Sequence, residues 1–563
     1  MAEYLHPGVY VEEYDSGAVP MQGVSTSTAG FLGIAERGPV SGKPQLVTSF
    51  ADYKRIYGGY LSEARFGSAR YLPYAVEQFF MNGGSRAYIM RADAEGSCAA
   101  SVVCGALTVT AANPGSWGDR VRVTVGSASK AKTQVLSAEG AVLVLKNADG
   151  FNAGDPVEMY DGTTKAYGRV ASVLDRTVTL EEAPSIDVAD AAVGTPKYIR
   201  TCELTVSVRL DDQVETYENV SLDPAASNYI GAVSKKSDIA VITGGSYDAA
   251  TPFEAVGGSE DPMTAALSGG SDGNVAKIGA DSYLGSDNGP GARTGLQAFL
   301  ESGNVSIMAI PGVTDPTVQA ALIAFCENQA SCFAILDIPM DLRKTNEVAE
   351  FRDMYDSTFA AMYHPWIEMY DAGSRRTAYF PPSGAMAGIY ARTDNSRGVH
   401  KAPANEIVRG CTGLSCSYND AEQDILNPIG VNLIRSFTGR GIRVWGARTI
   451  SSNGLWKYLN VRRLFIYVEQ SIKANTDWVV FEPNSEVLWS RVTQTISSFL
   501  ATCWRDGALA GTTPEQAFFV ECGHSTMTQD DIDNGRLICS IGIAPVKPAE
   551  FVIFRLTQKT ASE

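Results

Sequence analysis

Apolar side chains recur at helical spacing in several parts of the chain, next to short runs of β-prone residues. One such stripe covers 72–80 and ends at Asn82-Gly83-Gly84, where a helix is expected to stop. A strand–helix–strand unit is expected at 304–338, and a further amphipathic helix at 485–507. These patterns predict a mixed α/β protein.

A different pattern fills the stretch from 105 to 210. It contains short segments of alternating apolar and polar residues, separated by turns such as Asp149-Gly150 and Asp161-Gly162. Residues 246–292 are rich in Gly, Ser, Asp and Pro, which favours long loops or a partly ordered linker. We therefore expect a β-rich module inserted into the α/β framework and facing outward.

Each end of the chain carries a β-prone run with no obvious partner in its own sequence. The first follows Pro7-Gly8 and the second follows Pro545 and Pro548, which favour extended backbone. A lone strand pairs either with its own sheet or with that of a neighbour. Two such strands suggest a subunit that is linked to copies of itself. The residues expected to form these linking strands are Val9, Tyr10, Val11 and Glu12 at the front, and Phe551, Val552, Ile553 and Phe554 at the back.

Length and composition limit the classes of protein that fit. At 563 residues the chain exceeds one hydrophobic core, and about four domains are expected. No apolar run approaches the ~20 residues that span a bilayer, and the front of the chain lacks a secretory signal pattern, so no membrane insertion is expected. The ten cysteines include no CxxC pair. Reduced, buried thiols are therefore expected, which favours synthesis and assembly in a cytoplasm.

The charge is uneven along the chain. The net charge of −17 argues against general binding of nucleic acid, but no acidic residue lies between Asp424 and Glu469. Two interpretations stay open: an ordinary solvated surface, or a basic face that contacts an acidic partner. The cations of this stretch are Arg435, Arg440, Arg443, Arg448, Lys457, Arg462 and Arg463.

Candidate catalytic and metal-binding residues are few. The four histidines show no metal-ligand spacing. The acidic run from Asp530 to Gly535 has Ile541 where a calcium loop requires glutamate, so an acidic turn or helix start is the better interpretation. Asp337 follows a strand, as catalytic groups of α/β enzymes do, but no nucleophile or cofactor motif accompanies it. We expect no catalytic residue, no cofactor and no metal.

Several segments, taken together, resemble the contractile tail sheath proteins of phages, R-type bacteriocins and related injection systems. The likeness covers roughly 1–95 and 345–563, with weaker matches between. The segments that carry it are Pro7 to Glu13, Ala29-Gly30-Phe31-Leu32-Gly33, Arg37-Gly38-Pro39, Asp530 to Leu537, and Ala544 to Phe551.

The resemblance implies a multidomain α/β fold whose core is built from both chain ends and carries inserted outer domains. The expected division is an N-terminal linking arm at 1–22, a first part of the core at 23–96, an inserted β-rich outer domain at 97–210, a second α/β inserted domain at 211–344, a second part of the core at 345–545 and a C-terminal linking arm at 546–563.

It also implies a structural role. Such subunits form stacked hexameric rings that surround an inner tail tube protein, meet baseplate and tail terminator proteins, and contract to drive the tube through a cell envelope. The implied location is a virion tail or contractile particle assembled in the bacterial host cytoplasm. The alternatives are an α/β hydrolase or carbohydrate-active enzyme with a β-rich accessory module, and a nucleic-acid binder that uses the basic stretch.

Overall fold

The computed structural model describes residues 21–189 and 197–553 and is organised around a sheet of eight strands. The six inner strands are parallel, and the strand at each edge is antiparallel to its neighbour. The order across the sheet is β2 (Gln45–Val47), β3 (Ala87–Arg91), β1 (Ala29–Gly33), β20 (Ile307–Ala309), β21 (Phe333–Asp337), β22 (Ala360–His364), β26 (Val431–Phe437) and β27 (Gly441–Val444).

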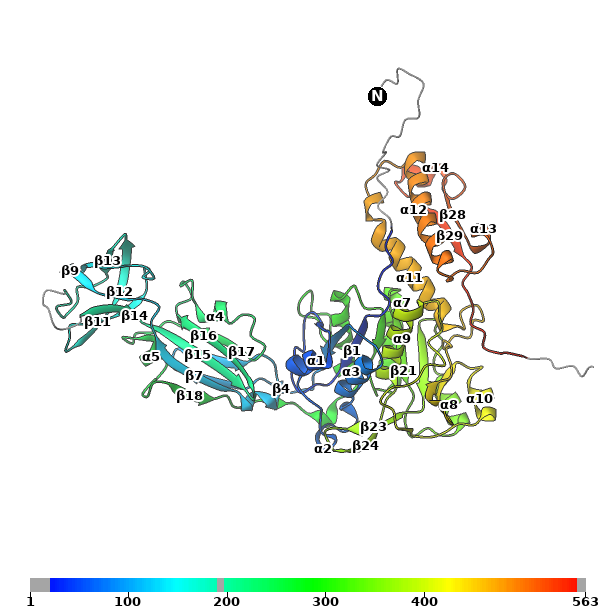
Figure 1. Ribbon diagram of the computed structural model, residues 1–563, viewed down its shortest axis with the longest axis horizontal. Coiled ribbons are helices and arrows are strands. Elements are labelled where there is room, and N and C mark those ends of the chain that lie inside the picture. Colours follow the sequence, from blue (N-terminus) through cyan, green and yellow to red (C-terminus); the bar gives the residue numbers. More distant parts are fainter. Residues whose placement is uncertain (1–20, 190–196, 554–563) are drawn as a thin grey trace, which may run out of the picture.

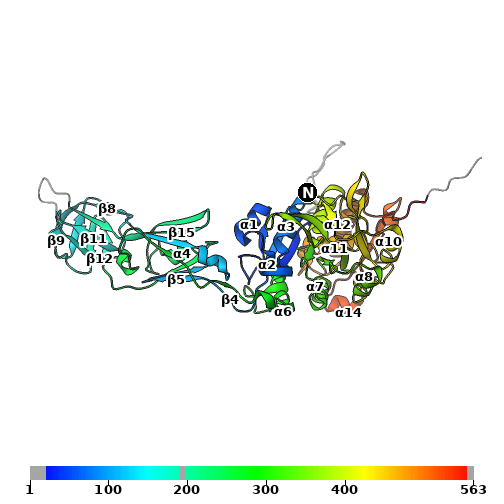
Figure 2. The ribbon, with the colours of Figure 1, turned by 90° about the horizontal axis from the view of Figure 1, so that it is seen from below.

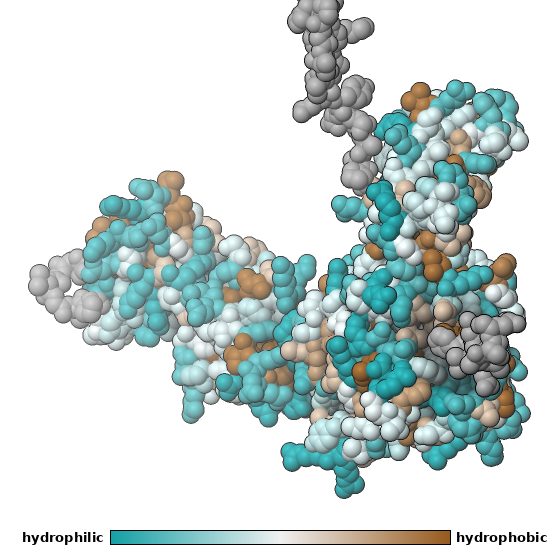
Figure 3. All heavy atoms as spheres, turned by 45° about the vertical axis from the view of Figure 1, so that its right-hand side comes forward, coloured by the Kyte–Doolittle hydropathy of each residue, from teal (hydrophilic) through white to brown (hydrophobic). Residues whose placement is uncertain are grey.

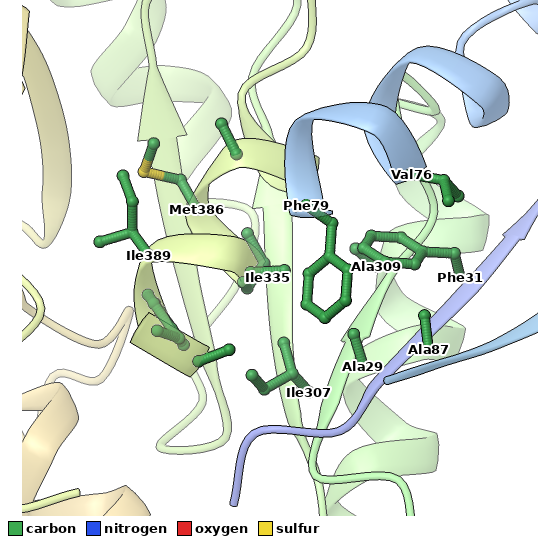
Figure 4. Close-up of a cluster of buried hydrophobic side chains, with 14 of the residues drawn as sticks. Ala29, Phe31, Val76, Phe79, Ala87, Ile307, Ala309, Ile335, Met386 and Ile389 are labelled. Carbon is green, nitrogen blue, oxygen red and sulfur yellow. The ribbon is translucent and has the colours of Figure 1, made fainter. Parts of the chain in front are cut away.

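Helices cover both faces of this sheet, and successive strand residues alternate between two buried clusters. Phe31 faces the cluster that contains residues of α3 (Leu72–Met81) and α9 (Ser383–Arg397), whereas Leu32 faces the other. Figure 4 shows the first cluster, with Phe79 of α3 beside Phe31. The opposite face is covered by α7 (Pro316–Gln329), α8 (Thr345–Arg352) and α10 (Asp420–Leu426). Burial on both faces explains the nearly continuous apolar runs of these strands.

The close packing of α3 against α9 depends on a small residue. A Cβ atom at Gly384 would lie 2.4 Å from the carbonyl oxygen of Ala75, well inside van der Waals contact. Glycine at this position therefore permits the two helices to approach over the sheet. The predicted helix at 72–80 is confirmed, as is the helix in the 304–338 unit.

The sheet order corrects the expected domain boundaries. Strands β20 and β21 were expected within a separate domain at 211–344, but β20 pairs directly with β1 in the central sheet. The strand–helix–strand unit was recognised, but its pairing partner lies more than 270 residues earlier and is not encoded by local pattern. The inserted β-rich part, called the outer arm below, correspondingly extends past 210, to about Asp272.

The outer arm consists of two β modules in series (Figures 1 and 2). The proximal module encloses one buried cluster between two sheets, and the distal module has its own cluster within a seven-stranded sheet. The proximal strands are β5 (Ser101–Cys104), β6 (Leu107–Ala111), β7 (Arg122–Ala128), β15 (Glu203–Leu210), β16 (Gln213–Val220), β17 (Ala240–Gly244) and β18 (Met263–Ala266). The distal strands are β8 (Lys132–Thr133), β9 (Val135–Glu139), β10 (Val142–Leu145), β11 (Pro156–Tyr160), β12 (Lys165–Leu174), β13 (Thr177–Leu180) and β14 (Tyr198–Thr201).

A helical module continues the chain beyond the central sheet. In Figure 1 it stands above the core, on α11 (Leu459–Asn475). The helix expected at 485–507 is confirmed as α12 (Glu486–Arg505), and a hairpin of β28 (Phe518–Cys522) and β29 (Cys539–Ile543) packs against it. Trp489, Phe499 and Leu500 of α12 lie in the buried cluster of this module.

Short elements complete the chain, and the surface in Figure 3 is mostly hydrophilic with small separate apolar patches. The 246–292 stretch, expected as loops, contains some of them, including β18. Among the described residues, no helix is both long and apolar enough to cross a bilayer. The remaining elements are α1 (Phe50–Tyr57), α2 (Glu63–Phe66), α4 (Ile230–Val233), α5 (Pro252–Ala255), α6 (Ala280–Leu284), α13 (Pro514–Ala517), α14 (Gln529–Asp533), β4 (Ser97–Cys98), β19 (Ser271–Asp272), β23 (Ile367–Asp371), β24 (Arg376–Phe380) and β25 (Gly413–Leu414).

Candidate inter-subunit interface

The β28–β29 hairpin is a two-stranded sheet, and among the described residues no further strand lies on its outer edges; the nearest pairing is a single bridge between Leu509 and Pro545, just past β29. The two strands pair with each other, and no other strand in the described part of the chain pairs with either. A hydrogen bond of 2.8 Å from Ala544 N to Ala517 O marks these two residues as a hydrogen-bonded pair. Because hydrogen-bonded and non-hydrogen-bonded pairs alternate along the ladder, Val520 and Ile541 form a non-hydrogen-bonded pair. The backbone N–H and C=O groups of Val520 and Ile541 therefore point away from the hairpin. Edge groups of this kind accept an added strand.

One face of the hairpin is buried and the other is open. Val520 and Ile541 pack against the cluster around α12, whereas Phe519 is 52% exposed. The Phe519 ring covers Gly542 on the facing strand, where a Cβ atom would lie 2.0 Å from ring carbon Cε1. A two-stranded hairpin is marginal alone, so the packing on α12 holds this platform in place.

The loop that joins the two strands is closed by the acidic run noted in the sequence. The Thr528 side chain caps α14, accepting from the backbone N–H of Asp531. Arg536 donates to Asp530 at 2.7 Å and to Asp531 at 2.8 Å. The interpretation as a helix start is confirmed, and these carboxylates hold the loop through an arginine.

The front of the described chain runs along α11. The Asn475 side chain accepts from Gln22 N at 3.2 Å and donates to Gln22 O at 2.8 Å, and Ser471 Oγ accepts from Val24 N at 3.1 Å. Gly23 lies so close to Tyr467 that a Cβ atom would stand 2.0 Å from its hydroxyl oxygen. These contacts fix where the front of the chain meets the helical module. The predicted linking residues Val9, Tyr10, Val11 and Glu12 lie outside the described residues, as does Phe554.

The back of the chain is anchored to the core by one glutamate. Arg448 donates to both carboxylate oxygens of Glu550, at 2.8 and 2.6 Å, and Asn427 donates to the same group at 2.8 Å. Burial alone would raise the pKa of Glu550, but these hydrogen bonds and the Arg448 charge hold it below its ordinary value. Glu550 also borders a groove of about 600 Å³ between the end of the chain and the core.

Beyond this anchor the chain turns apolar and exposed. Phe551, Val552 and Ile553 are 73, 68 and 80% exposed and belong to no strand of the described structure. Three consecutive exposed apolar residues after a fixed anchor form a segment that gains by burial elsewhere.

The acid-free stretch is largely neutralised by acids from other parts of the chain. Arg448, Arg462 and Arg463 are at least 92% buried. The pairs, with their shortest distances, are Arg435–Asp420 at 2.7 Å, Arg448–Glu550 at 2.6 Å, Arg462–Glu469 at 3.0 Å and Arg463–Asp394 at 2.6 Å. The basic face suggested by the sequence is therefore much smaller in the structure. A segment without acidic residues can still be neutralised by acidic residues from other segments that pack against it.

Three cations of that stretch form no ion pair within the described residues: Arg440, Arg443 and Lys457. Arg440 is exposed and lies over the rings of Phe437 and Trp445, with its guanidinium carbon 5.3 and 5.5 Å from their centroids. Arg443 donates to the Asn405 carbonyl oxygen at 2.7 Å, which orients it at the edge of the central sheet. These cations remain candidates for contact with another chain.

Titratable groups at the carboxyl edge of the sheet are enclosed. Burial raises the pKa of Asp337 to about 6, although Gly312 N and the Ser383 N–H and hydroxyl donate to its carboxylate. Burial lowers the pKa of His364 to about 4, and its Nε2 lies 3.6 Å from Cys416 Sγ. Asp337 and His364 are 2 and 0% exposed, so both side chains are enclosed by the protein. Asp337 instead ties the first turn of α9 to β21.

Two protein-family models match adjacent parts of this chain. The family model for the phage tail sheath protein central domain matches residues 276–450, and that for the phage tail sheath C-terminal domain matches residues 451–559. Together they span half of the chain. The tail sheath protein of Burkholderia phage BcepMu is 25% identical over 61% of this chain and 72% of its own length. That of Escherichia phage P2 is 24% identical over 54% of this chain and 79% of its own length.

Solved structures share the fold over nearly the whole length. The sheath of the PVC extracellular contractile injection system, in its contracted state, matches 99% of this chain and 99% of its own, with 22% identity and a TM-score of 0.53. The sheath tail protein of Listeria innocua matches 93% of this chain and 96% of its own, with 10% identity and a TM-score of 0.54. With its sheath-family domains, its multidomain α/β core and its outer β modules, this chain belongs to the contractile tail sheath protein family, as a structural subunit.

Proposed function

We propose that this chain polymerises as stacked hexameric rings around an inner tube, and that contraction of the polymer drives the tube through a target cell envelope. The observation that carries the proposal is the β28–β29 hairpin, whose open edges lie in the same module as the contacts of the front of the chain. Helical and baseplate assemblies of similar sheath proteins, including contracted ones, support the same arrangement.

The linking strands supply the connection between subunits. We assign Val9–Tyr14 and Phe551–Leu556 as donated strands and the hairpin as their acceptor. A donated strand of about six residues forms several backbone hydrogen bonds of about 1 kcal/mol net each, in addition to side-chain burial. Such a link would hold two subunits together while their rigid modules rotate, because each donated segment is covalently continuous with its own core.

Contraction then requires two packings of the same modules. Each subunit contributes a free-energy difference of a few kcal/mol between an extended and a shorter, wider polymer, and the sum over many subunits is large. The Glu550 anchor keeps the start of the donated segment in place on its own core during that change.

Further partners follow from the same assembly. We assign contact with the tube or a neighbouring subunit to Arg440, Arg443 and Lys457, or to the exposed side of α12. Baseplate and tail terminator proteins would bind the ends of the polymer. The location is a tail or contractile particle assembled in the cytoplasm of the host.

The test is removal of residues 1–18. We expect the shortened protein to keep its secondary structure and thermal midpoint but to lose polymers by negative-stain electron microscopy and sedimentation. The matched control is the full chain in the same buffer and at the same concentration. Normal polymers from the shortened protein would contradict the assigned role of the front strand.

A further inference from the structure

We propose that Cys522 and Cys539 form a dithiol site that takes small disulfides, such as oxidised glutathione, and closes into a cross-strand disulfide. The site lies in the hairpin, between the last residue of β28 and the first residue of β29. Its existence is independent of the proposed function; only its effect on the polymer rests on that function.

The ladder places the two cysteines directly opposite each other. They form the last residue pair of the hairpin. Counting from the hydrogen-bonded pair Ala517–Ala544, this pair falls at a non-hydrogen-bonded position. Opposed Cα atoms at such positions are about 4.5 Å apart, which lies within the range that a disulfide bridges.

The side chains share one side of the hairpin. Both pack against the edge of the cluster around α12, and both are partly exposed, since the pair ends the ladder at Gly523. The pKa of Cys539 is raised to about 11, mainly by burial and then by the neighbouring Cys522 thiol. Burial also raises the pKa of Cys522. Both thiols are therefore protonated in the cytoplasm and exchange slowly, which suits a site that is oxidised after release.

Other cysteines provide a contrast in the same molecule. Cys326 and Cys332 are also close, with 3.4 Å between their sulfur atoms, but they are 0 and 2% exposed and closed to glutathione. Cys98 is exposed, and its thiol donates a hydrogen bond to Gly269 O. Among the described residues, no hydrogen bond joins it to another cysteine. Only a facing pair with access can pass from a mixed disulfide to an internal one.

The reaction balances in two exchange steps. The Cys522 thiolate attacks one sulfur of oxidised glutathione, forms a mixed disulfide and releases one glutathione thiolate. The Cys539 thiolate then attacks the Cys522 sulfur and releases the second glutathione. Two protein thiols lose two protons and two electrons, and one glutathione disulfide is reduced to two glutathione molecules.

The expected consequence is a more rigid strand acceptor. The disulfide ties β28 to β29 at the end that the capped loop already closes. In the unfolded chain it keeps residues 522 and 539 together, which lowers the conformational entropy of that state. In the assembled state this would lock each acceptor hairpin once the particle has left a reducing cytoplasm.

The experiment uses the full chain in its folded state. The protein is incubated with oxidised glutathione, alkylated under denaturing conditions, digested and analysed by mass spectrometry. We expect peptides containing Cys522 and Cys539 to be linked and free of alkylation, while Cys98 carries glutathione. Reduction with dithiothreitol should restore alkylation at both hairpin positions.

Two variants separate chemistry from folding. Cys522→Ser and Cys539→Ser should each leave the remaining cysteine with glutathione and no internal link. The thermal midpoint of the helical module should rise by several degrees on oxidation of the wild type and not of either variant. The proposal is overturned if Cys522 and Cys539 stay alkylated, or carry separate glutathiones, after Cys98 has reacted. The wild-type result alone decides this, even if a variant fails to fold.

Discussion

Three buried arginines, Arg70, Arg448 and Arg463, form ion pairs with acids that are far away in the sequence. Arg463 binds Asp394 with both terminal nitrogens and also donates to Thr26 O, so one guanidinium joins α11, α9 and the front segment. The sequence showed that Arg448 and Arg463 lie in a run without acidic residues, but it did not show which distant acids pair with them. Side-chain pairing depends on tertiary contacts, which a composition pattern cannot contain.

Arg440, which is exposed, and Arg443, which is half-buried, give the first prediction at this scale. Arg440→Glu with Arg443→Glu should leave the thermal midpoint within about 1 °C, since surface charges contribute little to stability, but should reduce polymerisation on the tube protein severalfold. Co-sedimentation with the tube measures this. The control is Arg176→Glu, an exposed arginine of the distal module. Equal polymerisation by both variants would place the tube contact elsewhere.

Asp371 gives the second prediction. Arg70 donates to its carboxylate at 2.8 Å and Tyr74 at 2.6 Å. Burial opposes ionisation, but these bonds, with others from Ser374 and Gly373 N, lower the pKa from 3.8 to about 2. The stabilisation is fully present above pH 3.8 and is lost as the pH falls through about 2, and the gap corresponds to about 2 kcal/mol.

Asp371→Asn should therefore lower the urea midpoint of core unfolding at pH 7 and flatten its dependence on pH between 2 and 4. Urea titrations across that range measure both effects. The control is Asp238→Asn, whose partner Arg55 is exposed. An unchanged midpoint for Asp371→Asn would contradict the stabilising role of this buried pair.

At the scale of elements, local pattern predicted the helices and the outer strands but not the pairing of buried strands. The helices at 72–80 and 485–507 have clear apolar stripes and cap residues, and both are observed. The parallel strands are apolar throughout, so their neighbours in the sheet depend on topology. The proposed acceptor role of the hairpin was missed, because its edges become visible only when the sheet is assembled.

The proposed acceptor role of the hairpin leads to a third prediction. A peptide of residues 4–18 should bind the protein that lacks 1–18 and protect from hydrogen exchange the outward amide on the edge where it adds, that of Val520 on β28 or that of Ile541 on β29. A control peptide with Val9→Pro and Val11→Pro should not, because proline cannot donate to the ladder. Protection elsewhere, or equal protection by both peptides, would contradict strand addition at this hairpin.

At the scale of the whole molecule, the two outer modules are nested insertions: the distal module lies within the proximal one, and the proximal one lies within the core. The distal module enters between β7 and β15, which pair with Ala128 opposite Glu203. The sequence showed that a β-rich part exists but not that it is divided in two. Each module has its own buried cluster, which explains how such a long insertion is tolerated.

This layout gives the fourth prediction. Replacing residues 129–202 with Asn-Gly should close β7 and β15 as a tight hairpin and leave the proximal module and core folded. Polymers of this variant should have the normal axial repeat and a smaller outer diameter, as measured by electron microscopy. Aggregated protein would show that the distal module supports the fold of the rest.

The most direct test of the central claim is negative-stain electron microscopy of the concentrated full chain, alone and with its tube protein. We predict striated hollow cylinders with six-fold end views, and their loss when residues 1–18 are removed. Single particles under both conditions, from protein with an intact thermal transition, would contradict the claim that this chain links to copies of itself to form a sheath.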